Sequence, residues 1–309
     1  MSSGPGARLA YLGTSEFAAT VLRRLAASPF RPALVVTPPD RRQGRGRRLA
    51  PPPAAVAARE EGLELHQSTD VNAEESLVTL DAAGVELGLV CAFGQFLKDP
   101  LLDRLELLNV HPSLLPRWRG AAPIERAIMA GDSRTGVAII RVTADLDAGP
   151  IALCEPVAIE PEDDFGTLSA RLAELSGELA LRALELRAAG ELRFTEQDEK
   201  AMTYADKIDP AERRLDPRRP AVELERTVRA LRPHIGTYLE LEDGSRLGIA
   251  RGAAVDRGRS EPGELTADGD ALLLGCDPGA LRIVAVRPPG KREMAAGDYL
   301  RGHPLPRVA

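Results

Sequence analysis

Two polar side chains, those of Asn109 and His111, stand at the end of an apolar run, residues 105–110, that predicts a buried strand. Because they are two residues apart, both side chains leave the same face if the strand continues to His111. An amide and an imidazole placed in this way can together hold a polarised carbonyl group. For His111 taken alone, a local hydrogen bond in the loop that begins at Pro112 is the simpler interpretation.

A carboxylate, that of Asp147, follows a second apolar run at residues 135–142 and precedes Gly149. An Asp in front of a glycine turn commonly forms an Asx turn with its own backbone. For Asp147 taken alone, this turn is the interpretation that the residue pattern favours.

The elements that must position these side chains alternate along the first part of the chain. A strand, a glycine turn at Gly13 and a helix capped by Ser15 open the sequence, and the alternation predicts an α/β fold with a doubly wound, mostly parallel sheet. Gly13 lacks the further glycines of a dinucleotide-binding loop. We expect strands at 8–12, 33–36, 63–66, 87–93, 105–110, 135–142 and 152–159, and helices at 16–27, 54–61, 73–83, 123–129 and 165–189.

The last hundred residues have a different pattern. A helix at 221–231 is followed by short alternating segments between glycine and proline turns, at 236–241, 246–250, 263–266, 271–276 and 281–286. Such segments predict a small antiparallel barrel of the OB type, a module that often binds nucleic acid. The alternative is a structural appendage. We therefore expect an α/β domain at 1–189, a linker at 190–208 and an OB-like domain at 209–309.

Composition limits the protein class. The 309 residues are 44% hydrophobic and 28% charged, as is ordinary for globular proteins. No apolar stretch approaches the ~20 residues that span a bilayer, and residues 1–8 lack a signal peptide's apolar segment, so we expect a cytosolic protein with no membrane partner. Three distant cysteines, Cys91, Cys154 and Cys276, suggest neither disulfides nor zinc; we expect them to be buried, and we expect no metal.

The net charge of −6 excludes binding of nucleic acid through an overall basic field, so any such contact must use local patches. One patch lies in a loop at 40–49, where glycines separate Arg41, Arg42, Arg45, Arg47 and Arg48. Five guanidinium groups in one short loop repel one another unless an anion binds them. The alternative is a solvated, flexible loop, which is what most runs of charge are.

The segment 109–124, NVHPSLLPRWRGAAPI, closely resembles the signature of the formyltransferases that use 10-formyltetrahydrofolate. The resemblance covers nearly the whole chain and includes CAFGQFLK at 91–98, TADLDAGPI at 143–151, TYADKI at 203–208 and RPPGKREMAAGDYLRG at 287–302. It implies transfer of a formyl group from 10-formyltetrahydrofolate, with Asn109, His111 and Asp147 as the catalytic residues.

The resemblance also implies binding residues and partners. Folate would lie against Phe93, Gly94, Ser113, Leu114, Leu115 and Pro116. The formyl acceptor would be initiator methionyl-tRNA, held by Arg41, Arg42, Arg45, Arg47, Arg48 and Lys207, with no obligate protein partner. This chain has Gln95 and Lys98 where the family usually has apolar residues or proline, and Thr143 and Asp145 where relatives commonly have Asp and Gly.

Two alternatives stay open. A formyltransferase that acts on an amino sugar nucleotide would share the catalytic residues and can share the C-terminal barrel; the arginine-rich loop argues against it. A non-enzymatic RNA-binding protein built on an inactive transferase domain is disfavoured because Asn109, His111 and Asp147 are all present.

Overall fold

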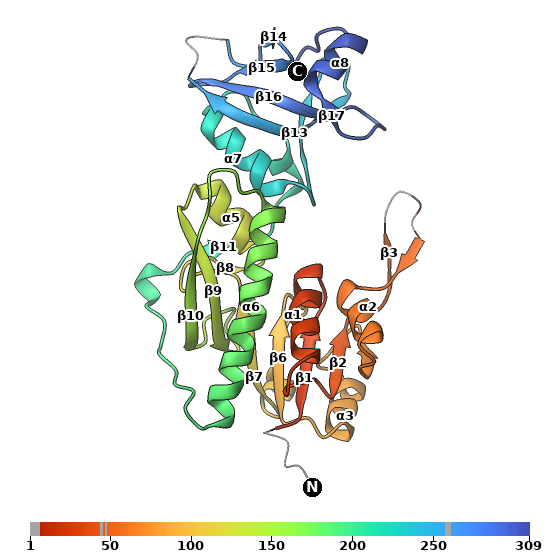
Figure 1. Cartoon of the computed structure of the whole chain (residues 1–309), viewed down its shortest axis with the longest axis vertical. Coiled ribbons are helices and arrows are strands. Elements are labelled where there is room, and N and C mark those ends of the chain that lie inside the picture. The colour runs from red at the N-terminus through yellow and green to blue at the C-terminus, as the bar shows by residue number, and fades with distance from the viewer. Residues whose placement is uncertain (1–6, 44–45, 47, 257–260) are drawn as a thin grey trace. The chain divides into compact units, whose positions relative to one another are not determined.

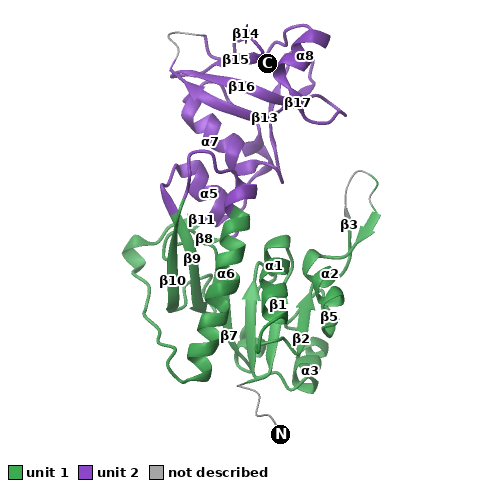
Figure 2. Cartoon of the chain, viewed as in Figure 1, with its two compact units in different colours: residues 1–120, 135–158, 169–204 green, residues 121–134, 159–168, 205–309 purple. Residues whose placement is uncertain are grey.

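The computed structural model describes residues 7–43, 46, 48–256 and 261–309 (Figure 1). The chain forms two compact units (Figure 2). Unit 1 comprises residues 1–120, 135–158 and 169–204, and unit 2 comprises residues 121–134, 159–168 and 205–309. The two units therefore interleave along the sequence, and short segments from the first part of the chain belong to unit 2.

Unit 1 is built on a seven-stranded sheet with the order β10-β9-β7-β6-β1-β2-β5. Its strands are β1 (Leu9–Gly13), β2 (Leu34–Thr37), β5 (Leu65–Gln67), β6 (Leu87–Cys91), β7 (Glu106–His111), β9 (Arg134–Arg141) and β10 (Ile151–Ala158). The pairs from β5 through β2, β1 and β6 to β7 are parallel, whereas β9 is antiparallel to β7. The predicted mostly parallel α/β sheet is confirmed.

Helices accompany the parallel strands, as the alternation predicted for all of them except the short α4. They are α1 (Glu16–Ala26), α2 (Pro53–Glu60), α3 (Glu74–Ala82), α4 (Asp99–Leu102) and the long α6 (Phe165–Ala188), whose first turn belongs to unit 2. Helix α1 begins where Ser15 Oγ accepts a hydrogen bond from the backbone N of Ala18, which confirms the predicted N-cap. Its apolar residues Val21, Leu22 and Leu25 are completely buried. The apolar face of the helix therefore packs into the core of unit 1.

Unit 2 contains an antiparallel sheet with the order β12-β13-β16-β15-β14, to which β17 adds by pairing with β16. The strands are β12 (Thr237–Glu240), β13 (Arg246–Val255), β14 (Leu265–Asp268), β15 (Ala271–Gly275), β16 (Ala280–Arg287) and β17 (Met294–Ala295). Helices α5 (Pro123–Ala130), α7 (Ala221–Leu231) and α8 (Ala296–Gly302) belong to the same unit, with the short helix η2 (Pro210–Arg213). The prediction of a small antiparallel module is confirmed.

Strand β13 is longer than predicted. It pairs with β16 as far as Val255, although the alternation of apolar residues ends at Ala250. The register shifts on both sides of Arg251, so a bulge interrupts the alternation while the backbone ladder continues.

The arginine-rich loop also contains regular structure. Strands β3 (Arg41–Gln43) and β4 (Arg48–Ala50) form an antiparallel hairpin in which Arg41 pairs with Ala50 and Arg42 with Leu49. Arg45 and Arg47 lie outside the described residues. The hairpin was not predicted because its strands are polar and lack an apolar face.

The cysteines follow the prediction at two of three positions. Cys91 and Cys276 are buried, and burial raises the pKa of the Cys91 thiol to about 12. Cys154 is exposed, so the prediction of burial was wrong there. It lies on β10, the last strand in the order of the sheet, and among the described residues no strand follows it on that side. Within the described residues, no helix is both long enough and apolar enough to span a membrane.

Gly136 on β9 provides a test of this packing. A Cβ atom there would lie 2.2 Å from the carbonyl oxygen of Glu155 on β10, so Gly136→Ala forces the backbones apart. We expect a loss of about 1–3 kcal/mol in the free energy of unfolding, as overpacking typically costs. Calorimetric unfolding is the measurement. Gly302→Ala, which has no atom within 4 Å of its Cβ, is the control and should be neutral; an equal effect of both changes would refute the steric explanation.

Candidate functional site

Asn109, His111 and Asp147 lie together where β7 ends. Strand β7 continues to His111, with Asn109 opposite Ile140 and His111 opposite Ala138 of β9, so the amide and the imidazole share one face. Asn109 Nδ2 donates to Asp147 Oδ1 at 3.1 Å. His111 Nδ1 is 3.6 Å from Asp147 Oδ2, an ion-pair distance rather than a hydrogen bond. The structure thus brings the three predicted residues together, with Asn109 and His111 beside the carboxylate of Asp147.

His111 also forms a local hydrogen bond in the loop that follows β7. Its Nε2 lies 2.8 Å from the carbonyl oxygen of Trp118. A carbonyl oxygen only accepts, so Nε2 carries a proton. The His111 side chain is only 5% exposed, and both of its nitrogens face polar atoms. The local hydrogen bond that the sequence offered for His111 is confirmed, and its role in holding a polarised carbonyl stays a prediction.

Asp147 adopts a conformation that its surroundings must enforce. Its φ of 48° is left-handed, which is uncommon for a residue other than glycine. The carboxylate accepts a hydrogen bond from the backbone N of Gly120 at 2.9 Å. Two residues later, a Cβ on Gly149 would lie 1.8 Å from the carbonyl oxygen of Arg141, so only glycine fits there. Asp145, by contrast, is exposed.

Two residues that the sequence gave no reason to select complete this arrangement. Gln197 Nε2 donates to the backbone oxygens of Asp147 at 2.8 Å and Gly149 at 2.7 Å. Arg119, which is 2% exposed, donates to Gln197 Oε1 from Nε and Nη2. Arg119 belongs to the quoted motif, but Gln197 lies in the segment predicted as a linker, 50 residues beyond Asp147, and no sequence pattern marks it.

The candidate folate residues follow two neighbouring strands, β6 and β7. The strand order changes direction between β1 and β6, because β2 and β5 lie on one side of β1 and β6 and β7 on the other. Ligands of open α/β sheets bind at the carboxyl ends of strands beside such a switch point. There, Thr14 Oγ1 donates to the carbonyl oxygen of Phe93 at 2.5 Å, which joins the loops after β1 and β6.

The six candidate folate residues fall into a buried group and a group that solvent can reach. Phe93, Ser113 and Leu115 are buried, and Ser113 Oγ donates to the carbonyl oxygen of Arg117. They shape the loops from within. Gly94 is exposed, and Leu114 and Pro116 are half-buried; these three are the ones whose surfaces a ligand can reach.

The polar residue Gln95 has a structural explanation. Its Oε1 accepts from the backbone N of Val71 and its Nε2 donates to the carbonyl oxygen of Ser68, both at 2.8 Å. Asn72 adds two bonds to the same loop, to Phe96 O and from Lys98 N. The loop after β6 is therefore held by the loop between β5 and α3, through contacts that an apolar residue at position 95 cannot make.

The candidate tRNA residues that the structure describes are exposed. Cross-strand pairs share a face of a hairpin, so Arg41 and Arg48 lie on one face of the β3–β4 hairpin, and Arg42 lies on the other with the exposed Leu49. Lys207 is exposed in unit 2. The described candidates thus belong to both units.

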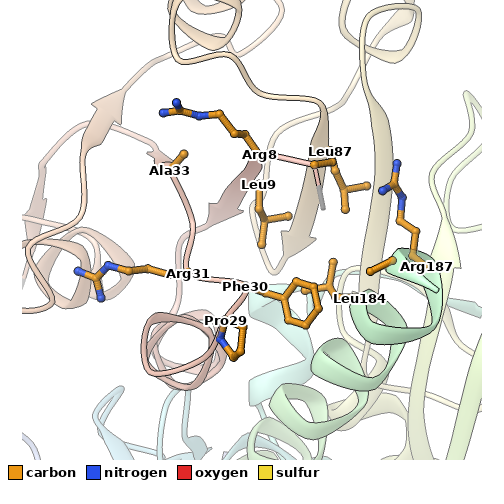
Figure 3. A pocket seen from close by; sticks show the side chains of 11 residues that line it. Arg8, Leu9, Pro29, Phe30, Arg31, Ala33, Leu87, Leu184 and Arg187 are labelled. Atoms are coloured by element: carbon orange, nitrogen blue, oxygen red, sulfur yellow. The ribbon is translucent and has the colours of Figure 1, made fainter. Parts of the chain in front are cut away.

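A cavity of about 210 Å³ lies elsewhere in unit 1 (Figure 3). Its lining includes Leu9 and Leu87, the first residues of β1 and β6, so it lies at the amino ends of the strands. His111 is the last residue of the parallel strand β7, at the opposite end. Figure 3 shows Leu9 and Phe30 turned toward the cavity, and the guanidinium groups of Arg8 and Arg31 turned away.

The described residues contain no cluster of three or more His, Cys, Asp or Glu side chains that would hold a metal.

Comparison with known proteins agrees with the fold. Residues 7–184 match the family model described as formyl transferase, and residues 207–304 match the formyl transferase C-terminal domain. The chain belongs to the formyl transferase family. It is 39% identical to the methionyl-tRNA formyltransferase of Parvibaculum lavamentivorans over 96% of this chain and 97% of the relative, and 42% identical to that of Methylococcus capsulatus, with the same coverage.

Solved structures share the fold at lower identity. HypX from Aquifex aeolicus in complex with tetrahydrofolic acid aligns with a TM-score of 0.64 and 17% identity, over 95% of this chain and 47% of HypX. The sugar 3N-formyl transferase WlaRD aligns with a TM-score of 0.65 and 13% identity, over 93% of this chain and 99% of WlaRD.

The contacts of Gln95 generate a testable prediction. Gln95→Leu leaves the buried N–H of Val71 without its acceptor, which typically costs about 1–3 kcal/mol. We expect lower thermal stability and faster hydrogen exchange at the Val71 amide. Gln95→Glu keeps an acceptor for Val71 but loses the donor to Ser68, so exchange at Val71 should be slower than in the Leu variant. Wild-type exchange in Gln95→Leu would contradict the proposed anchoring.

Proposed function

We propose that this chain transfers the formyl group of 10-formyltetrahydrofolate to the α-amino group of methionine on initiator methionyl-tRNA, giving N-formylmethionyl-tRNA for translation initiation in the cytosol. The observation that carries the proposal is the near-complete match, in both family regions, to relatives named methionyl-tRNA formyltransferase. The placement of Asn109 and His111 beside the carboxylate of Asp147 also supports it, because it supplies what acyl transfer to an amine needs.

The chemistry sets the task of these residues. The amino nitrogen forms a bond to the formyl carbon, negative charge develops on the formyl oxygen, the bond from that carbon to N10 of the folate breaks, and the proton released by the amine passes to N10. An α-amino group titrates near pH 8, and that of an aminoacyl ester titrates lower still, so the nucleophile needs little activation at neutral pH. The protein must mainly position both reactants and stabilise the developing oxyanion.

Asn109 is the resident oxyanion donor in this proposal. Its amide carries two N–H bonds, of which one is directed to Asp147 Oδ1. The other is left for the formyl oxygen. Because Asp147 fixes the orientation of the amide before substrates bind, the donor needs no reorganisation during the reaction.

His111 is the second donor. Its Nε2–H is directed to the neutral carbonyl of Trp118. Turning that N–H to the developing oxyanion exchanges a neutral acceptor for a charged one, and charge-assisted hydrogen bonds are roughly twice as strong. Asp147, on the Nδ1 side of the ring, stabilises positive charge on His111 and helps to move the proton from the attacking nitrogen to N10.

The folate and the tRNA have separate supports. Exposed surfaces of Gly94, Leu114 and Pro116, shaped by buried Phe93, Ser113 and Leu115, would face the folate. For the tRNA, the hairpin arginines Arg41, Arg42 and Arg48, with Arg45 and Arg47 between them in sequence, would bind phosphates, and Lys207 would add a contact from unit 2. Guanidinium groups suit this role because their donors match phosphate oxygens in pairs.

The catalytic assignment is tested by Asn109→Ala and His111→Ala. Removal of one oxyanion donor typically lowers kcat by about 10²–10³-fold, and we expect this for each variant. The KM values should change little, because the lost interaction belongs to the transition state. The measurement is steady-state formylation of initiator methionyl-tRNA with 10-formyltetrahydrofolate, with the double variant expected near the worse single one.

The control is Asp145→Asn, which changes an exposed carboxylate in the same loop and should keep wild-type kcat. A kcat for Asn109→Ala within about fivefold of wild type would exclude Asn109 as an oxyanion donor. A wild-type protein that binds folate but does not formylate methionyl-tRNA would refute the proposed substrate and point to an amino sugar nucleotide.

The role of the hairpin is tested by Arg41→Ala, Arg48→Ala. We expect a higher KM for methionyl-tRNA. The slope of log KM against the logarithm of the salt concentration should decrease by about 0.7–0.9 per arginine, because each phosphate contact releases counterions. The kcat should stay at the wild-type value. Arg8→Ala removes one positive charge at the amino end of β1, the opposite end of the sheet, and is the control for loss of charge away from the hairpin. An unchanged salt dependence would show that this face of the hairpin does not contact the tRNA.

A further inference from the structure

We infer that Gln197 is a positioning residue for Asp147, and that Arg119 orients Gln197 for this task. The inference rests on the proposed function, since it gives Gln197 a role in the same reaction. Gln197 lies between helix α6 and strand β11 (Tyr204–Ala205), next to the short helix η1 (Glu199–Ala201), in a polar segment that the sequence presents as a linker.

The amide of Gln197 uses its full hydrogen-bonding capacity. Nε2 donates to the backbone oxygens of Asp147 and Gly149 at 2.8 and 2.7 Å, and Oε1 accepts from Nε and Nη2 of Arg119 at 2.9 and 2.8 Å. An amide has two N–H bonds and two lone pairs on oxygen, so all four are satisfied. Gln197 is 8% exposed. A buried and saturated amide of this kind can take only one orientation.

Arg119 determines that orientation. A guanidinium group only donates, so it must face the oxygen of Gln197 and thereby direct the NH₂ group to the two carbonyls. Arg119 is itself held by Glu199, with Nη2 at 2.7 Å from Oε1, and this hydrogen bond lowers the pKa of the Glu199 carboxyl. Its backbone N also donates to the carbonyl oxygen of Thr203, through which β8 (Arg119–Gly120) adjoins β11.

The contacts of Gln197 lie at the turn that aims the catalytic carboxylate. They hold the carbonyls on both sides of Ala148, directly after the left-handed Asp147. The carboxylate of Asp147 meets the backbone N of Gly120, and Gly120 follows Arg119. Arg119, Gln197, Asp147 and Gly120 thus close a ring of contacts. Loss of Gln197 removes the hydrogen bonds that hold the backbone of Asp147. The carboxylate can then shift, which weakens its hydrogen bonds from Asn109 and Gly120.

Two substitutions separate positioning from mere anchoring of the linker. Gln197→Met removes all four hydrogen bonds at similar side-chain length. Gln197→Glu keeps acceptors for Arg119 but places a carboxylate against the carbonyls of Asp147 and Gly149. If Gln197 positions Asp147, both variants should lower kcat by about 10–100-fold with KM values within about threefold, because misplaced catalytic groups lose rate more than binding. If it only anchors the linker through Arg119, Gln197→Glu should keep wild-type kcat.

A double-mutant comparison and an exchange measurement complete the test. In an Asp147→Ala background, Gln197→Glu should cost less than about threefold in kcat, because a residue that acts through Asp147 has no further effect once Asp147 is gone. Hydrogen exchange at the Gly120 amide, the donor to Asp147, should be faster in both Gln197 variants. Glu196→Gln, at the exposed neighbouring residue, is the control and should match wild type.

The outcomes are distinguishable. Wild-type kcat in Gln197→Glu, full additivity with Asp147→Ala, or unchanged exchange at Gly120 would each overturn the inference. Failure of the wild-type protein to formylate methionyl-tRNA would instead overturn the proposed function, and the exchange at Gly120 would still decide whether Gln197 holds Asp147. If Gln197→Met does not fold, Gln197→Glu, which keeps the buried guanidinium paired, carries the test.

Discussion

A carboxylate whose side chain is only 13% exposed has lost most of its water, and N–H groups must replace it. For Asp147 these groups are the amide of Asn109 and the backbone N of Gly120, with the imidazole of His111 nearby. They come from β7 and from the loop that follows it. The candidate site therefore exists only if a loop 38 residues beyond Asn109 returns to the end of β7, and that requirement explains much of the local structure.

The direction of β9 makes this return difficult. Because β9 is antiparallel to β7, the chain leaves it at Arg141, which lies opposite Leu108, and must then turn back toward Asn109. A tight reversal needs left-handed backbone and close approach of main-chain atoms. Asp147 supplies the first and Gly149 the second, since no side chain fits beside the carbonyl of Arg141. The strain of a left-handed Asp is held by hydrogen bonds to its backbone and its carboxylate.

The fold is predictable from the sequence where apolar periodicity carries the information. The buried strands β1, β2, β6 and β7 were located to within about two residues because continuous apolar runs are typical of strands buried on both faces. The fold is not predictable from the sequence where backbone pairing or a distant side chain decides the structure. The polar β3–β4 hairpin and the bulged end of β13 have no apolar alternation, exposure of Cys154 depends on strand order, and Gln197 meets Asp147 only in the fold. The catalytic candidates were found through the resemblance of a motif, whereas nothing nearby in sequence indicates the residues that hold them.

The polar segment before β11 decides where unit 1 ends along the chain. The two family matches end at residue 184 and resume at residue 207, so Gln197, Glu199 and Thr203 lie in neither of them. Compactness gives a different boundary, because unit 1 continues to residue 204. A fragment cut at the end of the first match would leave Arg119 buried without its acceptors and the carbonyls of Asp147 and Gly149 without donors, and unpaired buried polar groups are costly. By this physical criterion the segment up to residue 204 packs as part of unit 1.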